Sequence, residues 1–99
     1  MANYHLTNKA VSDLSQIWNY SCKNWSERQA DKYYNELLKA CEKISRNPDF
    51  GKKYIKVIPD LYGLQVNRHI IFYRRLNSET IEVTRILHEK MDLKNRILE

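Results

Sequence analysis

The sequence is poor in the residues that build common catalytic and ligand-binding motifs. It has only two glycines, Gly51 and Gly63, so it holds no glycine-rich loop of the kind that cradles phosphates. Its two cysteines and three histidines are scattered without metal-ligand spacing, so we expect no metal and no cofactor. No apolar run approaches the ~20 residues of a membrane span, and the N-terminus lacks a signal-peptide pattern, so we expect no membrane partner. What remains for function is a set of Arg, Lys, His and Tyr side chains, mostly in the second half.

The two cysteines, Cys22 and Cys41, each fall in the apolar stripe of a predicted helix. If these helices fold back on each other near Trp25, the cysteines lie ~20 Å apart at a rise of ~1.5 Å per residue. A disulfide tolerates no more than ~7 Å between Cα atoms. We therefore expect two buried free thiols and a cytoplasmic protein.

The length of 99 residues suits one domain, residues 1–99, with a small core. The formal net charge is +5, and most of the excess lies in the second half. Residues 1–51 hold seven Lys or Arg against six Asp or Glu, whereas residues 52–99 hold ten against six. One interpretation is an acidic partner, such as nucleic acid, an acidic protein surface or an anionic membrane. The other is an ordinary solvated basic surface.

Two amphipathic helices are predicted in the first half of the chain. Apolar residues recur every three or four positions over residues 8–24, and again between Ser26 and Asn47. Ser26 stands where its hydroxyl can cap the second helix, with glutamine three residues later. Pro48 ends that helix, because its ring pushes the preceding residue out of the helical region. So short a link between the two predicts an antiparallel helical hairpin.

The other segments predict a strand before the helices and a meander after them. Apolar residues alternate with polar ones in most of these runs, and the run over residues 69–75 is apolar on both faces, as in a central strand. The predicted strands are residues 3–6, 54–58, 61–67, 69–75 and 80–88. The predicted connections are a loop over Asp49–Lys53, a bend at Asn67 or Arg68 and a hairpin turn at Asn77-Ser78.

Asp92 is a good capping residue for a short final helix over residues 93–98. The order of the main elements is then β-α-α-β-β-β with a short C-terminal helix. We expect an α+β fold in which the helical hairpin packs on a mainly antiparallel sheet.

The last predicted strand carries the most informative polar residues. Counting by twos places Arg85 with Ile81 and Val83 on the face that should meet the helices, and His88 on the opposite face. A buried guanidinium needs a partner. Arg85 therefore either forms a structural ion pair with a helix carboxylate such as Asp13, or grips an acidic group of a partner. His88 either orders the turn that follows it or acts as a general acid or base.

Arg68, Arg74 and Arg75 can form a row that faces phosphates, although a solvated cationic face is the commoner arrangement. Lys52, Lys53 and Lys56 form a basic cluster after the predicted loop, and the sequence leaves open whether it contacts the target, DNA or neither.

One ordered set of residues runs over nearly the whole chain. It comprises Ala10, Asp13, Leu14, Ile17, Trp18 and Tyr20, then Trp25, Gln29-Ala30 and Tyr33, then Asn47-Pro48 followed by Gly51, and then residues 68–73. Its most specific part is Arg85-Ile86-Leu87-His88 followed by Met91-Asp92. In this order and spacing, the chain resembles the ParE-type toxins of the RelE/ParE superfamily of bacterial toxin–antitoxin pairs. Ser26 stands where members of that family usually have glycine, and as a better cap it should leave the turn intact.

The resemblance implies a fold, a partner and a target. The implied fold is a helical hairpin against an antiparallel sheet. The implied partner is a ParD-like antitoxin, in a hetero-oligomeric complex that meets operator DNA only through the antitoxin. The implied target is DNA gyrase, which the toxin blocks by binding without chemistry of its own. The candidate residues for binding target or antitoxin are Trp25, Lys52, Lys53, Arg68, Arg74, Arg85, His88, Met91 and Asp92.

The alternative is a ribosome-dependent mRNA endonuclease, the activity of other members of the superfamily. Such an RNase needs side chains that activate the 2′-hydroxyl and stabilise the phosphorane, for which Arg68, Arg85, His88 and Lys90 are the candidates. However, all seven tyrosines precede residue 74, whereas these RNases typically keep a basic and aromatic cluster in the tail. We therefore favour gyrase inhibition over enzymatic activity. A degenerate toxin that acts only as a repressor with its antitoxin is a third possibility.

Overall fold

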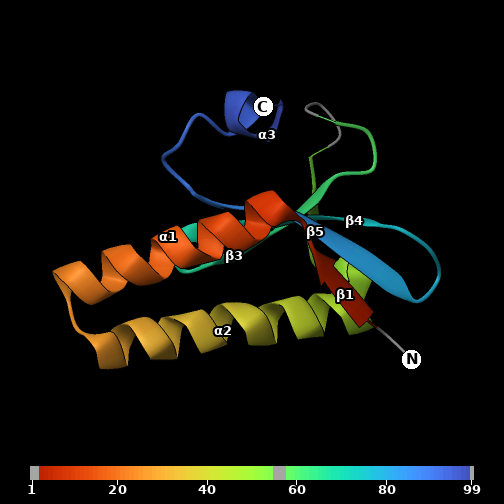
Figure 1. Ribbon diagram of the computed structural model, residues 1–99. Coiled ribbons are helices and arrows are strands. Elements are labelled where there is room, and N and C mark those ends of the chain that lie inside the picture. The colour runs from red at the N-terminus through yellow and green to blue at the C-terminus, as the bar shows by residue number, and fades with distance from the viewer. Residues whose placement is uncertain (1–2, 55–57, 99) are drawn as a thin grey trace.

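The computed structural model describes residues 3–54 and 58–98 of the chain. These residues form an α+β fold, as expected, with a strand first, two long helices next and most of the sheet afterwards (Figure 1). The elements are β1 (Asn3–Leu6), α1 (Asn8–Asn24), α2 (Glu27–Arg46), the 3-10 helix η1 (Pro48–Phe50), β2 (Lys52–Lys53), β3 (Tyr62–Val66), β4 (His69–Arg75), β5 (Thr80–His88) and α3 (Leu93–Leu98).

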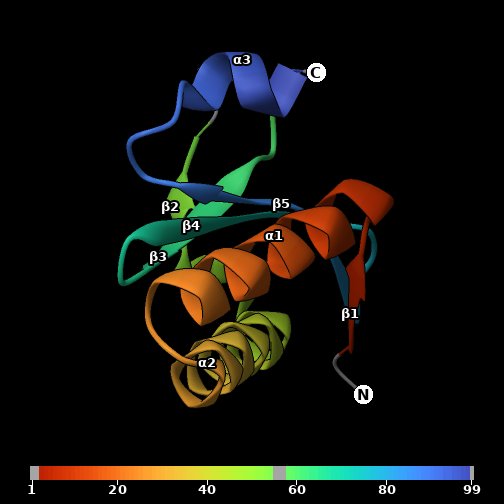
Figure 2. The ribbon, with the colours of Figure 1, turned by 60° about the vertical axis from the view of Figure 1, so that its left-hand side comes forward.

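The sheet separates two helical layers. Its strand order is β1-β5-β4-β3-β2, and β1 runs parallel to β5 whereas the other neighbours are antiparallel. The α1–α2 hairpin covers one face and α3 lies over the other (Figure 2). The main core lies under the hairpin, and a smaller cluster around Leu61, Phe72 and Leu87 lies under α3. None of the helices in the described ranges is long and apolar enough to cross a membrane.

Side-chain caps set the starts of both long helices. The Thr7 hydroxyl accepts a hydrogen bond from the Ala10 amide at 3.1 Å and donates one to the Thr84 carbonyl at 2.7 Å, which ties the start of α1 to β5. The Ser26 hydroxyl accepts from the Gln29 amide at 3.1 Å, so the predicted cap of α2 is confirmed. The hairpin therefore has a defined closed end, only two residues long.

The segment after α2 differs from its prediction. The expected loop over Asp49–Lys53 contains η1 and β2, and β2 pairs with β3 through Lys52 opposite Gly63. The strand expected over residues 54–58 is wrong at its two ends, because neither Tyr54 nor Ile58 is in a strand, while residues 55–57 lie outside the described residues. The cause is the buried Tyr73, whose hydroxyl donates to the Pro48 carbonyl at 2.7 Å and accepts from the Gly51 amide at 2.8 Å. These bonds hold the chain at the edge of the sheet at β2, before the segment over which the sequence pattern predicts a strand.

A β-bulge in β5 overturns the predicted strand faces. Phe72 pairs with Arg85 but Tyr73 pairs with Val83, so β5 has one extra residue at that point. Before the bulge Val83 packs under the helical hairpin, whereas after it Ile86 does, and Leu87 packs on the opposite side. The prediction that Arg85 shares the face of Val83, with His88 opposite, is therefore wrong.

The two cysteines are free, as predicted, but only one is fully buried. Cys41 is 0% exposed, and its burial raises the pKa of the thiol to about 12, so it stays protonated. Cys22 is only half-buried, which corrects the expectation for that residue.

Candidate functional site

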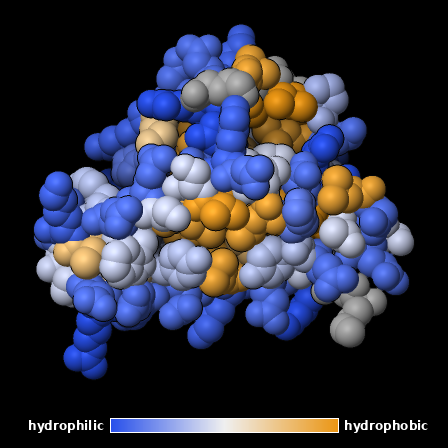
Figure 3. Space-filling view, viewed as in Figure 1, coloured by the Kyte–Doolittle hydropathy of each residue, from blue (hydrophilic) through white to orange (hydrophobic). Residues whose placement is uncertain are grey.

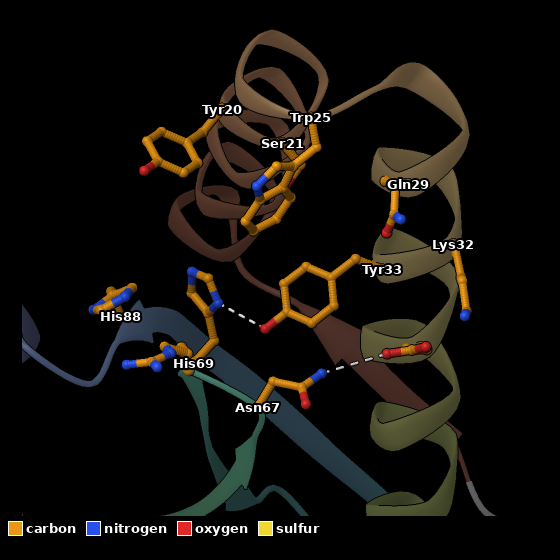
Figure 4. Close-up of a pocket in the computed structure, with 11 residues that line it drawn as sticks. Tyr20, Ser21, Trp25, Gln29, Lys32, Tyr33, Asn67, His69 and His88 are labelled. Atoms are coloured by element: carbon orange, nitrogen blue, oxygen red, sulfur yellow. Dashed lines mark hydrogen bonds between the residues drawn. The ribbon is translucent and has the colours of Figure 1, made fainter.

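A groove of about 420 Å³ lies where the closed end of the hairpin faces the β3–β4 turn. Both helices of the hairpin supply side chains to it, and so do β4 and β5 (Figure 4). The lining residues are Tyr20, Ser21, Trp25, Gln29, Lys32, Tyr33, Glu36, Asn67, Arg68, His69 and His88. We call this surface the hairpin groove.

Aromatic rings at the end of α1 form one wall of the hairpin groove. Tyr20 is 64% exposed and Trp25 is 67% exposed, and the two rings meet edge to face with centroids 6.4 Å apart. Such large exposed rings leave apolar area in contact with water at the rim of a concavity. The wall therefore offers a contact surface for apolar groups of another molecule.

Tyr33 and His69 join the two layers at the floor of the hairpin groove. The Tyr33 hydroxyl lies 2.7 Å from His69 Nδ1 and donates to the Val66 carbonyl at 3.0 Å. Because a hydroxyl carries one hydrogen, both contacts are satisfied when His69 Nδ1–H donates to the Tyr33 oxygen. Burial, followed by the nearby His88, lowers the pKa of His69 to about 4. Burial and then Glu36 raise the pKa of Tyr33 to about 12. Both side chains are therefore neutral at pH 7.

The bulge brings His88 into the hairpin groove. His88 lies directly opposite His69 across the strands, and their ring centroids are 5.3 Å apart. The backbone amide of Lys90 donates to His88 Nδ1 at 3.1 Å, so this nitrogen carries no proton. His88 thus orders the turn that follows it, in agreement with the structural interpretation of this residue.

The charges lining the hairpin groove are mainly positive. Arg68 is 69% exposed, and a carboxylate oxygen of Glu89 lies 3.8 Å from its guanidinium. Lys32 adds a second cation, whereas Glu36 is the one acid among the lining residues and accepts a hydrogen bond from Asn67 at 3.5 Å. With these two cations against one carboxylate, the lining of the groove has a net positive charge and favours acidic ligands.

Arg85 lies in an ion pair outside the hairpin groove. Its Nε and one Nη donate to the two oxygens of Asp13 at 2.8 and 3.0 Å, and another Nη donates to the Arg96 carbonyl at 2.8 Å. Asp13 also accepts the Ile86 amide at 3.0 Å, next to the bulge. The two side chains are only 12% and 9% exposed. The ion pair therefore links α1, β5 and α3, as the structural interpretation of Arg85 expects.

Three of the nine candidate binding residues line the hairpin groove, namely Trp25, Arg68 and His88. The others are spread over the molecule. Lys52 and Lys53 are exposed on the edge strand, Arg74 pairs with Glu82 at 3.0 Å, Met91 is 43% exposed and Asp92 caps α3 through the Asn95 amide. Of the four candidate RNase residues, Arg68 and His88 line the groove, whereas Arg85 is held by Asp13 and Lys90 follows the strand.

Sequence reasoning did not name Tyr20, Tyr33 and His69, among other residues of the hairpin groove, as candidates. Tyr33 fits the apolar stripe of α2, and nothing in its spacing indicates a hydrogen bond to a residue of a strand. His69 shares the groove with His88 only because of the bulge. Within the described residues there is no group of three or more side chains suited to holding a metal.

The lowered pKa of His69 predicts an acid-sensitive stability. Because the folded pKa of about 4 lies below the ordinary 6.5, the unfolded chain binds this proton first as the pH falls. The contribution of the neutral His69 ring to the free energy of unfolding is complete above pH 6.5 and is lost as the pH falls toward 4. We expect a loss on the order of 1–2 kcal/mol from this ring, discounted for its partial exposure. Urea denaturation at a series of pH values measures it, and His69→Gln should flatten this part of the profile. An equally steep profile in the variant would assign the acid sensitivity to carboxylates instead.

Comparison with known proteins gives a consistent family. Residues 4–93 match the model of "ParE toxin of type II toxin-antitoxin system, parDE". The chain is 33% identical over 92 residues to Toxin ParE1 of Mycobacterium tuberculosis, covering 93% of this chain and 94% of the relative. It is 32% identical over 92 residues, with the same coverage, to Toxin ParE1 of Caulobacter vibrioides. A solved structure described as the chromosomal ParDE TA system from P. aeruginosa has a TM-score of 0.75 at 18% identity, over 89% of this chain and 96% of that one.

Proposed function

Because the chain belongs to the ParE toxin family of the type II toxin–antitoxin system parDE, we propose that it binds DNA gyrase and blocks supercoiling, and that a ParD-like antitoxin neutralises it. In this proposal the toxin acts as a binding protein. It traps or inhibits the topoisomerase without making or breaking covalent bonds itself.

The observation that carries the proposal is that Arg85 already donates its hydrogen bonds to groups within the fold. Its guanidinium donates to both oxygens of Asp13 and to a carbonyl of α3, so its donors are turned toward the fold. A phosphorane-stabilising arginine must instead aim its donors at the reacting phosphate. His88 Nδ1 accepts the Lys90 amide, so this ring has only Nε2 left to offer a substrate. Of the four candidate RNase residues, Arg85 is therefore the one whose donors the fold itself uses.

A gyrase supercoiling assay with purified toxin tests the proposal. We expect the toxin to block the ATP-dependent supercoiling of relaxed plasmid, because it occupies the enzyme. A translating extract that contains a defined messenger is the matched assay for the alternative, and there the messenger should remain intact. Unimpaired supercoiling together with rapid message cleavage would replace gyrase inhibition by the RNase activity. Adding the antitoxin first should abolish the inhibition.

A further inference from the structure

The outer face of α2 carries a row of cations that the site described above does not explain. In a helix, positions that follow one another at intervals of three and four residues lie on one face. Positions 28, 32, 35, 39, 43 and 46 of α2 follow this spacing, and each of them except Asn35 is Arg or Lys. We call this surface the basic stripe, and its cations are Arg28, Lys32, Lys39, Lys43 and Arg46.

The basic stripe faces solvent along the whole of α2. All five cations are exposed, whereas the opposite face of the helix is buried in the main core through Leu37, Cys41 and Ile44. In Figure 1, α2 runs along the lower edge of the molecule, and in the same view Figure 3 shows mostly hydrophilic side chains along that edge. At a rise of ~1.5 Å per residue, the stripe is ~27 Å long from its first cation to its last.

The acids of α2 leave much of this charge uncompensated. Of the four acids on the helix, Asp31 accepts a hydrogen bond from the Trp18 indole of α1 at 2.8 Å. Glu36 accepts one from Asn67 of the β3–β4 turn at 3.5 Å. Both carboxylates are therefore directed toward neighbouring elements and away from the centre of the basic stripe.

The contacts that the five cations do make are weak ones. Arg46 pairs with Glu42 at 2.5 Å, but the two side chains are 70% and 55% exposed, so water screens this ion pair. Lys43 Nζ lies 4.2 Å from the centre of the Phe50 ring, which leaves its charge in place. Within the part of the chain that the structure describes, no carboxylate forms an ion pair with the other three cations, Arg28, Lys32 and Lys39.

We propose that the basic stripe binds the phosphate backbone of double-stranded DNA. A straight row of like charges is complementary to a polymer that carries about one negative charge per 1.7 Å of its axis. None of the five cations has an aromatic neighbour on the stripe, so the surface offers no platform on which the bases of a single strand can stack. A membrane fits less well, because the apolar face of α2 is packed in the core and cannot enter a bilayer.

This contact differs from the operator contact that the resemblance implies through the antitoxin. Contacts to phosphates hold a protein on a duplex without reading its sequence. The choice of DNA over another duplex rests on the proposed function, because gyrase acts on double-stranded DNA. The basic stripe then gives the toxin a contact with the same DNA that its target holds.

The test measures binding of the purified toxin, without gyrase or antitoxin, to a short labelled DNA duplex by fluorescence anisotropy over a series of salt concentrations. The stripe variant combines Arg28→Gln, Lys32→Gln and Lys39→Gln. The control variant removes the same charge from three exposed lysines outside α2, by Lys23→Gln, Lys90→Gln and Lys94→Gln.

The dependence of the affinity on salt identifies the contacts. Each phosphate contact contributes about 0.9 to the slope of the logarithm of affinity against the logarithm of salt concentration. We therefore expect the slope to become shallower by roughly two to three in the stripe variant, with an affinity about tenfold lower or more. The control variant should keep the slope of the wild type and lose about threefold at most.

Thermal melting checks that both variants fold, and glutamine is a good helix former at exposed positions. Absence of DNA binding by the wild type at low salt would overturn the proposal, and so would equal losses in the two variants. Tighter binding to an RNA duplex of the same length, or to vesicles that contain phosphatidylserine, would overturn DNA as the partner. A toxin that inhibits gyrase without binding DNA contradicts the basic stripe alone. A toxin that binds DNA through the stripe but leaves gyrase active contradicts the proposed function alone.

Discussion

Replacing Arg85 with alanine should lower the free energy of unfolding by about 3–5 kcal/mol, because it leaves the Asp13 carboxylate buried without its counter-ion. Asp13 is 8% exposed and, among the described residues, would keep the hydrogen bond from the Ile86 amide alone. The variant should also lose the bond from Arg85 to the Arg96 carbonyl, which helps hold α3 in place. Urea denaturation followed by tryptophan fluorescence measures the change.

The matched control is Arg74→Ala on the neighbouring strand. Arg74 also pairs with a carboxylate, that of Glu82, but its side chain is 53% exposed, so we expect a loss of at most about 1 kcal/mol. Any loss of toxicity in Arg85→Ala should follow from the unfolded fraction. An Arg85→Ala protein of normal stability that is nevertheless non-toxic would instead identify Arg85 as a contact residue for the target.

Replacing Gly51 with alanine should destabilise the fold by about 2–4 kcal/mol, because the new methyl group overlaps a buried ring. A Cβ at this position would overlap the Tyr73 hydroxyl and would lie 2.9 Å from its Cε1 and 3.0 Å from the Gly63 carbonyl. Tyr73 is 0% exposed and holds both Pro48 and Gly51 by hydrogen bonds, so the ring has no free direction in which to move. Thermal melting of the purified variant provides the measurement.

A double-mutant cycle with Tyr73→Phe identifies the cause. Removing the hydroxyl costs hydrogen bonds in the wild type, about 1–3 kcal/mol, but makes room for the methyl group in the Gly51→Ala background. The combined loss should therefore be smaller than the sum of the two single losses. Strict additivity would mean that the glycine is needed for another reason, since its φ of −80° is open to any residue.

The helical half of the fold was predictable because its signals are local. The apolar stripes, the Ser26 cap and the Asn47-Pro48 stop each act within a few residues, and α1 and α2 begin and end where these signals place them. β4 and β5 were also placed correctly, because each carries its own run of apolar residues.

The register between β4 and β5 was not predictable. A two-residue turn at Asn77-Ser78 would pair Leu76 with the residue that follows Ser78. Instead, the Leu76 amide donates to the Thr80 carbonyl at 2.9 Å across a longer turn. The bulge then shifts the pairing by one more residue over the part of β4 that contains His69. Each shift by one residue moves side chains to the other face. A sequence read by twos therefore could not place His88 beside His69 in the hairpin groove.

The same limit applies to β2 and to Arg85. Lys52 and Lys53 form β2 directly after a turn that Tyr73, more than twenty positions away in the sequence, holds by hydrogen bonds. The pairing of Arg85 with Asp13 was foreseen from the cost of a buried charge, although the face assigned to Arg85 was wrong. The cost of burying an unpaired charge therefore predicted the partner of Arg85 correctly, even though the predicted strand face was wrong.

We propose that this toxin acts on gyrase by binding and not by catalysis. The most direct measurement is the supercoiling rate at a fixed gyrase concentration and increasing amounts of toxin. A binding inhibitor predicts inhibition that grows in proportion to toxin and saturates near equal amounts, so that about a tenfold excess of gyrase keeps most of its activity. Full loss of supercoiling at that excess, progressing with time, would show turnover by the toxin and contradict the account.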